Sequence, residues 1–475
     1  MTRARELLAA GRHLDAFEAT EQAAARDADA EPPTLQFEAA WKALYDSVNR
    51  CDWRRHEDLQ RSVVAHISRG RAFVGETTLA SPLLDARTQL ATARNYYRPH
   101  AATPQAFVHR PPGARIRIGL VGADFHQQAT AYLLTGVIEQ FDRRRFELIA
   151  YDYGKDDGGA LRRRCQAAYD RLVPIHDLSD RDAASLIHGD GIDVLLHLRG
   201  LANGRIGLFA HRPAAIQIHY LYYPGTSGAA CMDYIVADDY VIPPDHESFY
   251  AERVLRLPGC YQPNDSRRAL PSARDRASFG LPADAVVLGN FGQHYKLTPE
   301  LFAAWCGLLA ADASRLLWLL GDDAAVQANL RRAAEAHGIS GERLVFSPPL
   351  GASDHLARLR ACDLLLDTFP YGGHTLTSDA LWAGTPVVTR SGDSFASRVA
   401  GSLLRAVGLE QLVARSAEEY RHIAETLLRD RPRREAIRGT LTTQRHQLAL
   451  FDSAAYARKL EAALLGVVAA RWQQG

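Results

Sequence analysis

The strongest constraint on the fold is an alternation of apolar strands and helices that occurs twice along the chain. From residue 115, apolar runs such as RIRIGLVG, FELIAYDYG and IDVLLHLRG are separated by helical segments. The alternation restarts near residue 285 with AVVLGNF, RLLWLLG, RLVFSPP, DLLLDTF and PVVTR. Strands that alternate with helices of this length predict βαβ units and parallel sheets. We therefore expect two doubly wound, Rossmann-like α/β domains that face a cleft, with ligands at the carboxyl ends of the strands.

The rest of the chain sets the domain boundaries. A length of 475 residues suits about three domains at roughly 150 residues each. The first part has a helical period and includes one unit that resembles a tetratricopeptide repeat (TPR). A stretch over 262–284 that is rich in Pro, Ser, Asp and Arg is typical of a hinge. The expected parts are a short α-helical, TPR-like segment and linker (1–110), an N-terminal lobe (111–268) and a C-terminal lobe (269–475).

Composition excludes several classes of function. With 56 basic and 55 acidic residues, the formal net charge is +1, so no overall field draws the chain to nucleic acid or an anionic membrane. The six cysteines form no CxxC pair, which argues against a zinc or redox motif. No apolar run reaches the ~18 residues of a membrane span, and the start of the chain lacks an apolar signal region. We expect a cytoplasmic protein with neither nucleic acid nor membrane as its partner.

The most informative motif is LLLDTFPYGGHTLTSDALWAGTPVVT at 364–389. A buried strand is followed by a Gly-containing loop, and a helix is predicted to begin near His374 or Thr375. Free N–H groups and the positive end of the helix dipole at such a start favour a diphosphate. Asp379, one turn further on, is placed to accept hydrogen bonds from ribose hydroxyls. The alternative is that the Thr and Ser side chains here only cap a helix.

A second motif, LGNFGQHYKLTPE at 288–300, contains a polar loop between a strand and a helix capped at Thr298. Gln293 and Lys296 lie in this loop. A lysine there would neutralise a diphosphate as it leaves a sugar, which is electrostatic stabilisation of developing charge. The alternative is a solvated surface lysine, although the chain has few lysines among its many arginines.

Other segments are less specific. The YPGTSG turn after a strand would expose Pro224, Gly225 and Thr226 at the cleft, or it is a plain Pro-Gly turn. The first strand of the N-terminal lobe lacks GxGxxG spacing, so a dinucleotide fingerprint is unsupported. The DxD patterns at Asp27-Ala28-Asp29 and Asp180-Arg181-Asp182 fall in a helical region and at a helix start, so we expect no catalytic metal.

Together these motifs resemble the catalytic region of the protein O-linked N-acetylglucosamine transferases, including the SPINDLY-like members, over roughly residues 40–470. The resemblance implies the GT-B architecture and an inverting transfer from UDP-GlcNAc to Ser or Thr of protein acceptors, without a metal or other cofactor. The motifs that carry it, in order, include CDW (51–53), RIRIGLVGADF (115–125), FAHRPAAIQ (209–217), YPGTSG (223–228), NFGQHYKLTPE (290–300) and LDTFPYGGHTLTSDALWAGTPVVT (366–389).

The resemblance also implies roles for single residues. It assigns diphosphate binding to Lys296 with Gln293 as a neighbouring polar donor. It assigns nucleotide binding to His374 and Thr375, and ribose binding to Asp379. A histidine near the uracil side of the pocket corresponds to His355. The acceptor and sugar would lie near Tyr222, Pro224, Gly225 and Thr226.

Departures from the family pattern leave alternatives open. Gln128 stands where a histidine is usual, and glutamine is no general base near neutral pH. Tyr222 replaces a small residue and would crowd an N-acetyl sugar, and Leu376 replaces a phosphate-side hydroxyl. The catalytic candidates are therefore Lys296, the Gln128 position and His188, with His126 as another possible base. Two alternatives remain: a nucleotide-sugar-binding module with a degraded catalytic site, and a transferase with another donor, such as GDP-fucose.

Overall fold

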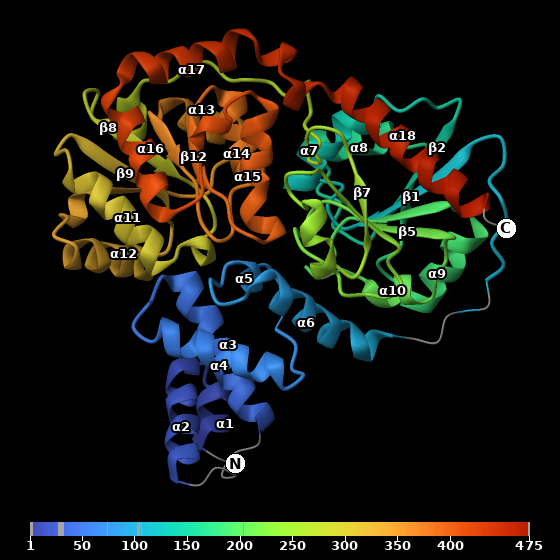
Figure 1. Cartoon of the computed structure of the whole chain (residues 1–475), viewed down its shortest axis with the longest axis horizontal. Coiled ribbons are helices and arrows are strands. Elements are labelled where there is room, and N and C mark those ends of the chain that lie inside the picture. The colour runs from blue at the N-terminus through green and yellow to red at the C-terminus, as the bar shows by residue number, and fades with distance from the viewer. Residues whose placement is uncertain are drawn as a thin grey trace.

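The computed structural model describes residues 3–26, 33–73, 75–101, 105, 107–202 and 204–473. Two α/β lobes lie side by side, with a helical segment beneath them at their junction (Figure 1). Both sheets are parallel, so the expected pair of Rossmann-like lobes in a GT-B arrangement is confirmed. The Asp27-Ala28-Asp29 pattern lies outside the described residues.

The N-terminal lobe has a seven-stranded sheet in the order β3-β2-β1-β4-β5-β6-β7. The order reverses between β1 and β4, where loops from adjacent strands run in opposite directions and open a crevice at the carboxyl ends. The inner strands are buried on both faces, as their continuous apolar sequences predicted, whereas the edge strands β3 and β7 are partly exposed. Their bounds are β1 Ile116–Gly122, β2 Phe146–Asp152, β3 Arg171–Pro174, β4 Val194–His197, β5 Ile216–His219, β6 Tyr234–Ala237 and β7 Arg253–Arg256.

The C-terminal lobe has a six-stranded sheet in the order β10-β9-β8-β11-β12-β13. Its order reverses between β8 and β11, so the loops that follow these two strands flank the crevice of this lobe. The strands are β8 Val286–Asn290, β9 Arg315–Leu320, β10 Leu344–Ser347, β11 Leu364–Leu366, β12 Val387–Arg390 and β13 Val413–Ala414.

Helices pack on both sides of the two sheets (Figure 1). The N-terminal lobe carries α7 Ala129–Ile138, α8 Ala160–Ala168, α9 Asp180–Gly189 and α10 Ile206–Ala210. The C-terminal lobe carries α11 Pro299–Ala310, α12 Ala324–Ala336, α13 Ala352–Ala361, α14 Thr375–Ala383, α15 Phe395–Ala406, α16 Ala417–Arg429 and α17 Arg431–Thr443.

The last helix, α18 (Ser453–Trp472), crosses back to the N-terminal lobe (Figure 1). Its apolar residues, among them Leu460 and Leu464, belong to the core beneath β1, β4 and β5. The hydroxyl groups of Tyr220 and Tyr456 are 2.8 Å apart and join β5 to this helix. By its packing, α18 therefore belongs to the N-terminal lobe. The predicted boundary of 269–475 had placed this helix in the C-terminal lobe. The helix thus fastens the two lobes together.

The N-terminal helices contact both lobes. Asn329 donates to the carbonyl of Arg50 at 2.9 Å, and Trp53 packs against Phe302, so this segment docks on the C-terminal lobe. At its other end Ala93 packs so closely on Gly228 that a Cβ there would meet backbone at 2.4 Å. The segment therefore bridges the mouth of the cleft. Its helices are α1 Arg3–Ala9, α2 His13–Arg26, α3 Pro33–Arg50, α4 His56–Ser68, α5 Glu76–Leu79 and α6 Ala86–Tyr97.

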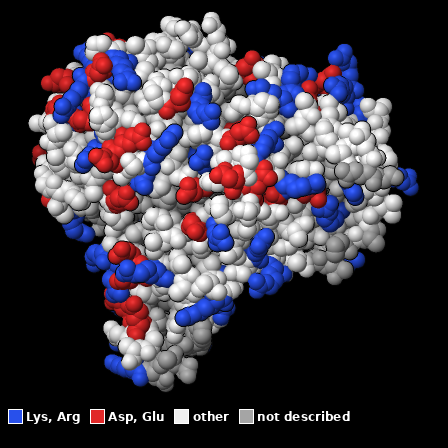
Figure 2. Space-filling view, in the orientation of Figure 1, with Lys and Arg blue, Asp and Glu red and all other residues white. Residues whose placement is uncertain are grey.

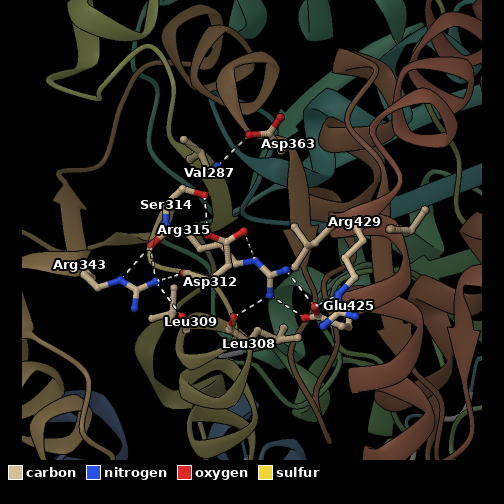
Figure 3. A network of polar contacts seen from close by, with 12 residues as sticks. Val287, Leu308, Leu309, Asp312, Ser314, Arg315, Arg343, Asp363, Glu425 and Arg429 are labelled. Atoms are coloured by element: carbon tan, nitrogen blue, oxygen red, sulfur yellow. Dashed lines mark hydrogen bonds and ion pairs between the residues drawn. The ribbon is translucent and has the colours of Figure 1, made fainter.

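A buried polar network supports the C-terminal lobe at the end of the sheet away from the cleft (Figure 3). The Arg315 guanidinium, at the start of β9, donates to both carboxylate oxygens of Glu425 at 2.6 and 3.0 Å and to the carbonyl of Leu308 at 2.7 Å. Arg429 approaches the same carboxylate from solvent. This pairing satisfies a guanidinium that is only 2% exposed.

The surface has mixed charge. On the face in Figure 2, basic and acidic side chains are interspersed and form no single large patch of one sign. Among the described helices, none combines the length and apolar character that a membrane span requires.

Candidate active site

A pocket of about 300 Å³ lies between the lobes. It sits at the carboxyl ends of the strands, because its walls include the loops that follow β8 and β11, the start of α7 and the loop after β5. The loops after β8 and β11 and the start of α7, which follows β1, lie where the reversed strand orders predict a ligand crevice, and the loop after β5 adds a wall beside them. The main polar and aromatic residues of its walls are Glu76, Gln128, Tyr222, Gln262, Gln293, Tyr295, Lys296, Thr368, Tyr371, His374 and Thr375.

Lys296 is the cation of the C-terminal wall. It follows β8 in a short 3-10 turn, and its Nζ donates to the carbonyl of Gly372 at 3.0 Å and lies 3.6 Å from the centre of the Tyr371 ring. Burial lowers the pKa of Lys296 to about 8, against the opposing charges of Asp367 and then Glu76. A partly dehydrated cation in this position is suited to meeting an anionic ligand.

A buried carboxylate shapes the loop beside Lys296. Asp367 follows β11 and accepts from the Gly373 N–H at 2.5 Å and from Thr389 Oγ1 at 2.6 Å. Burial raises the pKa of Asp367, and the charge of Lys296 acts in the opposite direction. A Cβ on Gly373 would come within 2.6 Å of Thr377 Oγ1 and 2.9 Å of Asp367, so the tight turn into α14 requires glycine.

The helix α14 begins at this loop, with His374 as its N-cap and Thr375 as its first residue, as predicted. The first N–H groups of a helix have no intrahelical acceptor, and Thr375 and Leu376, the first two residues of α14, both line the pocket. His374 Nε2 lies 3.3 Å from the Ala396 carbonyl. Burial, and next the charge of Lys296, lower the pKa of His374 well below its usual value, which favours a neutral imidazole. Lys296 and the helix start therefore form one anion-binding wall.

Asp379 lies one turn along α14, where it is paired. One carboxylate oxygen accepts from Arg268, and the other lies 3.5 Å from His355 Nε2. Burial would raise the pKa of Asp379, but the charge of Arg268 and the contact with His355 together lower it. His355 in turn packs edge-on against Phe291, which lines the pocket. The predicted ribose and uracil residues thus form one cluster, but neither Asp379 nor His355 is among the residues that line the pocket.

The N-terminal lobe supplies the opposite wall. Gln128 is the exposed N-cap residue of α7, and Tyr222 follows β5. The Arg199 guanidinium stacks on the Tyr222 ring, with its Cζ 4.3 Å from the ring centre. Arg199 also forms an ion pair with Asp124 at 2.8 Å. Burial, and next the charge of Glu76, raise the pKa of Tyr222 to about 12. A fixed aromatic ring therefore occupies the space that the sequence predicted to be crowded.

Several predicted site residues do not line this pocket. His188 lies on α9, 3.3 Å from the Pro213 carbonyl and stacked on Phe107, and it lines a separate hollow. The structure therefore places His188 outside this pocket. Thr226 is buried and donates to Glu252 at 2.7 Å.

The residues beside Thr226 have structural positions as well. Pro224 and Gly225 are buried behind Tyr222, and neither lines the pocket. His126 is half-buried at the end of β1 and is also absent from the pocket walls. None of these residues is among those that line the pocket, and their roles toward a ligand stay predictions.

The described residues offer no metal-binding group. No three His, Cys, Asp or Glu side chains within the described ranges are arranged to hold an ion. Ser179, and not Asp180, caps α9, because its hydroxyl accepts from the Asp182 N–H at 3.1 Å. Asp180 instead pairs with Arg205 at 2.7 Å. The independence from metal stays a prediction.

Sequence reasoning missed two charged residues of this region. Glu76 reaches the pocket from α5, in the helical segment that was expected only to precede the lobes. Arg268 lies in the predicted hinge, yet it is 9% exposed and pairs with Asp379. Neither residue lies in a motif that marks it, so only the three-dimensional arrangement identifies them.

Two facing Rossmann-like lobes with an anion-binding wall between them define the GT-B class of fold. The model of glycosyl transferase family 41 matches residues 96–277 and 270–460, so the chain belongs to this family. The resemblance found in its motifs is thereby confirmed.

Relatives agree with this assignment. The chain is 34% identical over 355 residues to the probable UDP-N-acetylglucosamine–peptide N-acetylglucosaminyltransferase SEC of Arabidopsis thaliana, which covers 73% of this chain and 36% of SEC. It is 27% identical to the UDP-N-acetylglucosamine–peptide N-acetylglucosaminyltransferase of Caenorhabditis elegans, over 76% of this chain and 41% of that protein. The chain therefore spans about two fifths of the length of these two relatives.

Solved structures share the fold. A mutant of the Thermobaculum terrenum O-GlcNAc transferase matches with a TM-score of 0.81 and 28% identity, over 99% of this chain and 97% of that one. The Anabaena protein HepE in complex with UDP matches with a TM-score of 0.51 and 14% identity, over 74% of this chain and all of that one. The second likeness concerns the fold alone.

Proposed function

We propose that this chain is an inverting, metal-independent glycosyltransferase that moves N-acetylglucosamine from UDP-GlcNAc to Ser or Thr hydroxyls of protein acceptors. The observation that carries the proposal is the single wall formed by Lys296, His374 and the start of α14. Lys296 and the helix N–H groups would stabilise the charge of the departing diphosphate. The names of the relatives support both the donor and the peptide acceptor.

The nucleoside would lie beside this wall. Asp379 would accept hydrogen bonds from the ribose, with Arg268 sharing its carboxylate, and His355 would border the base. Gln293, exposed at the rim, would donate to a phosphate oxygen. The sugar would then project toward Tyr222 and Gln128 on the opposite wall.

A panel of nucleotide sugars tests this function. We expect UDP and UDP-GlcNAc to raise the melting temperature, and calorimetry to give micromolar to low millimolar UDP affinity. A preference for a guanine nucleotide would replace the donor with one such as GDP-fucose. Absence of binding by every nucleotide and nucleotide sugar of the panel would overturn the transferase proposal.

A binding module without turnover is the second candidate. It is favoured by the presence of Gln128, Tyr222 and Leu376 in the pocket walls, where the family pattern has other residues. Donor turnover separates the two candidates. Conversion of UDP-GlcNAc to UDP by the wild type, lost in Lys296→Met, excludes an inert module.

A further inference from the structure

Transfer to a hydroxyl needs a proton acceptor, and the pocket offers few. His374 belongs to the diphosphate wall and lies 3.3 Å from the Ala396 carbonyl. Lys296 is the cation of that wall, and Gln128 cannot accept a proton near neutral pH. Among the described residues that line the pocket, Glu76 is the one carboxylate.

Glu76 is held in place by its neighbours. It is the first residue of α5, and the preceding Gly75 has a φ of 106°, a backbone conformation that residues with a Cβ rarely adopt. Tyr222 lines the same pocket, its ring is stacked by Arg199, and burial and then the charge of Glu76 raise the pKa of its hydroxyl. Burial, and to a smaller extent the charge of Glu76, also raise the pKa of Tyr223, Tyr295 and Tyr371.

The Glu76 carboxylate is not the main counter-ion of Lys296. Of the two acids that act on Lys296, Asp367 has the larger effect and Glu76 the smaller. Asp367 is buried in the loop before α14, where it accepts from Gly373 and Thr389. Glu76 is only half-buried and comes from a different part of the chain. The Glu76 carboxylate therefore remains free to interact with a substrate in the pocket.

We propose that Glu76 is the catalytic base of the transfer reaction, a role that rests on the proposed function. The acceptor oxygen attacks C1 of the sugar while its proton passes to the Glu76 carboxylate. The bond from C1 to the β-phosphate oxygen breaks, and its electron pair leaves with UDP. The new negative charge on UDP lies at Lys296 and the start of α14, and the proton on Glu76 later returns to solvent.

This step places the base in a part of the chain that belongs to neither lobe. The helical segment bridges the cleft mouth, with α5 at the junction of the lobes (Figure 1). Glu76 and Tyr222 line the same pocket as Lys296, so an acceptor hydroxyl and the donor sugar would share one cavity with the base.

The test is Glu76→Gln, with UDP-GlcNAc as donor and water or a synthetic Ser/Thr peptide pool as acceptor. Glutamine keeps the size and the polar carbonyl of the side chain but takes no proton, so a purely structural role would survive the change. We expect kcat to fall about 100-fold or more, which is the usual contribution of a general base. The Kd for UDP should stay within about three-fold, and the acidic limb of the kcat/KM profile should disappear.

The control is Glu57→Gln, the same change at an exposed side chain of the same helical segment, which should behave as wild type. Glu76→Asp provides a second variant, which should keep the acidic limb and more activity than Glu76→Gln. If the wild type turns over and Glu76→Gln has the same kcat and pH profile, the role of Glu76 is overturned while the proposed function stands. Lower activity in Glu76→Asp than in Glu76→Gln would have the same consequence. A wild type that binds no UDP would instead overturn the proposed function and this role together.

Discussion

Replacing Lys296 by Met tests the diphosphate wall most directly. Methionine has a similar length and keeps apolar contact with the Tyr371 ring, but it removes the charge that lies beside the start of α14. At ~4 Å and an effective dielectric of about 20, one unit charge acting on another contributes roughly 4 kcal/mol. Since about 1.4 kcal/mol is tenfold, the expected loss in kcat/KM is about 1000-fold.

The loss should fall mainly on kcat. Charge accumulates on the diphosphate as the glycosidic bond breaks, so Lys296 acts most strongly in the transition state. The fold should tolerate the change, because Asp367 keeps its bonds from Gly373 and Thr389. Release of UDP from UDP-GlcNAc gives the rate, and thermal melting reports the fold.

The matched control is Lys155→Met, the same change at an exposed lysine outside the pocket walls. It should retain the wild-type rate. A Lys296→Met enzyme within about three-fold of wild type would refute the electrostatic reasoning. An equal loss in Lys155→Met would point to a nonspecific effect of charge and would refute it as well.

Three other predictions concern the nucleotide and the fold. The charged form of Lys296 would bind the diphosphate, and the pKa of Lys296 in the protein without ligand is about 8. UDP affinity should therefore be full below pH 8 and fall by up to about tenfold per pH unit above it. Calorimetry at pH 7 and 9 should show this fall, and Lys296→Arg should abolish the pH dependence. If Asp379 binds the ribose, the affinity for UDP should be at least about tenfold higher than that for 2′-deoxy-UDP, and Asp379→Asn should remove most of that difference. A variant that keeps the wild-type preference for UDP would argue against ribose binding by Asp379. Arg315→Met should lower the free energy of unfolding in urea by about 3 kcal/mol, because it removes the two bonds to half-buried Glu425 and the bond to the Leu308 carbonyl. The exposed Arg429→Met should cost under about 1 kcal/mol, and equal costs would contradict this account.

The sequence was informative where function depends on local pattern. Lys296 and the start of α14 follow two strands, and the carboxyl ends of parallel strands meet at one edge of a sheet. Their meeting in one wall could therefore be predicted from strand–helix alternation and motif spacing. The position of His188 could not, because a histidine near the end of a helix faces either a ligand or a neighbouring loop, and here it stacks on Phe107.

The YPGTSG turn illustrates a second limit. Its hydroxyls looked available in sequence, but Thr226 donates to the carboxylate of Glu252, and none of residues 223–228 lines the pocket, whereas Leu221 and Tyr222 just before the turn do. Glu252 lies 26 residues further along the chain. A pairing between residues so far apart leaves no periodicity in the sequence to reveal it.

Glu76 shows the same limit with a larger consequence. More than 200 residues separate it from Lys296, and its short helix has no capping side chain or motif that would single it out. What brings it to the pocket is tertiary packing: the helical segment docks on the C-terminal lobe through Trp53 and on the N-terminal lobe through Ala93. The segment that a sequence pattern assigns to a separate domain therefore completes the pocket between the other two, and a chain trimmed to its two Rossmann-like lobes would lack the one carboxylate that its described walls contain.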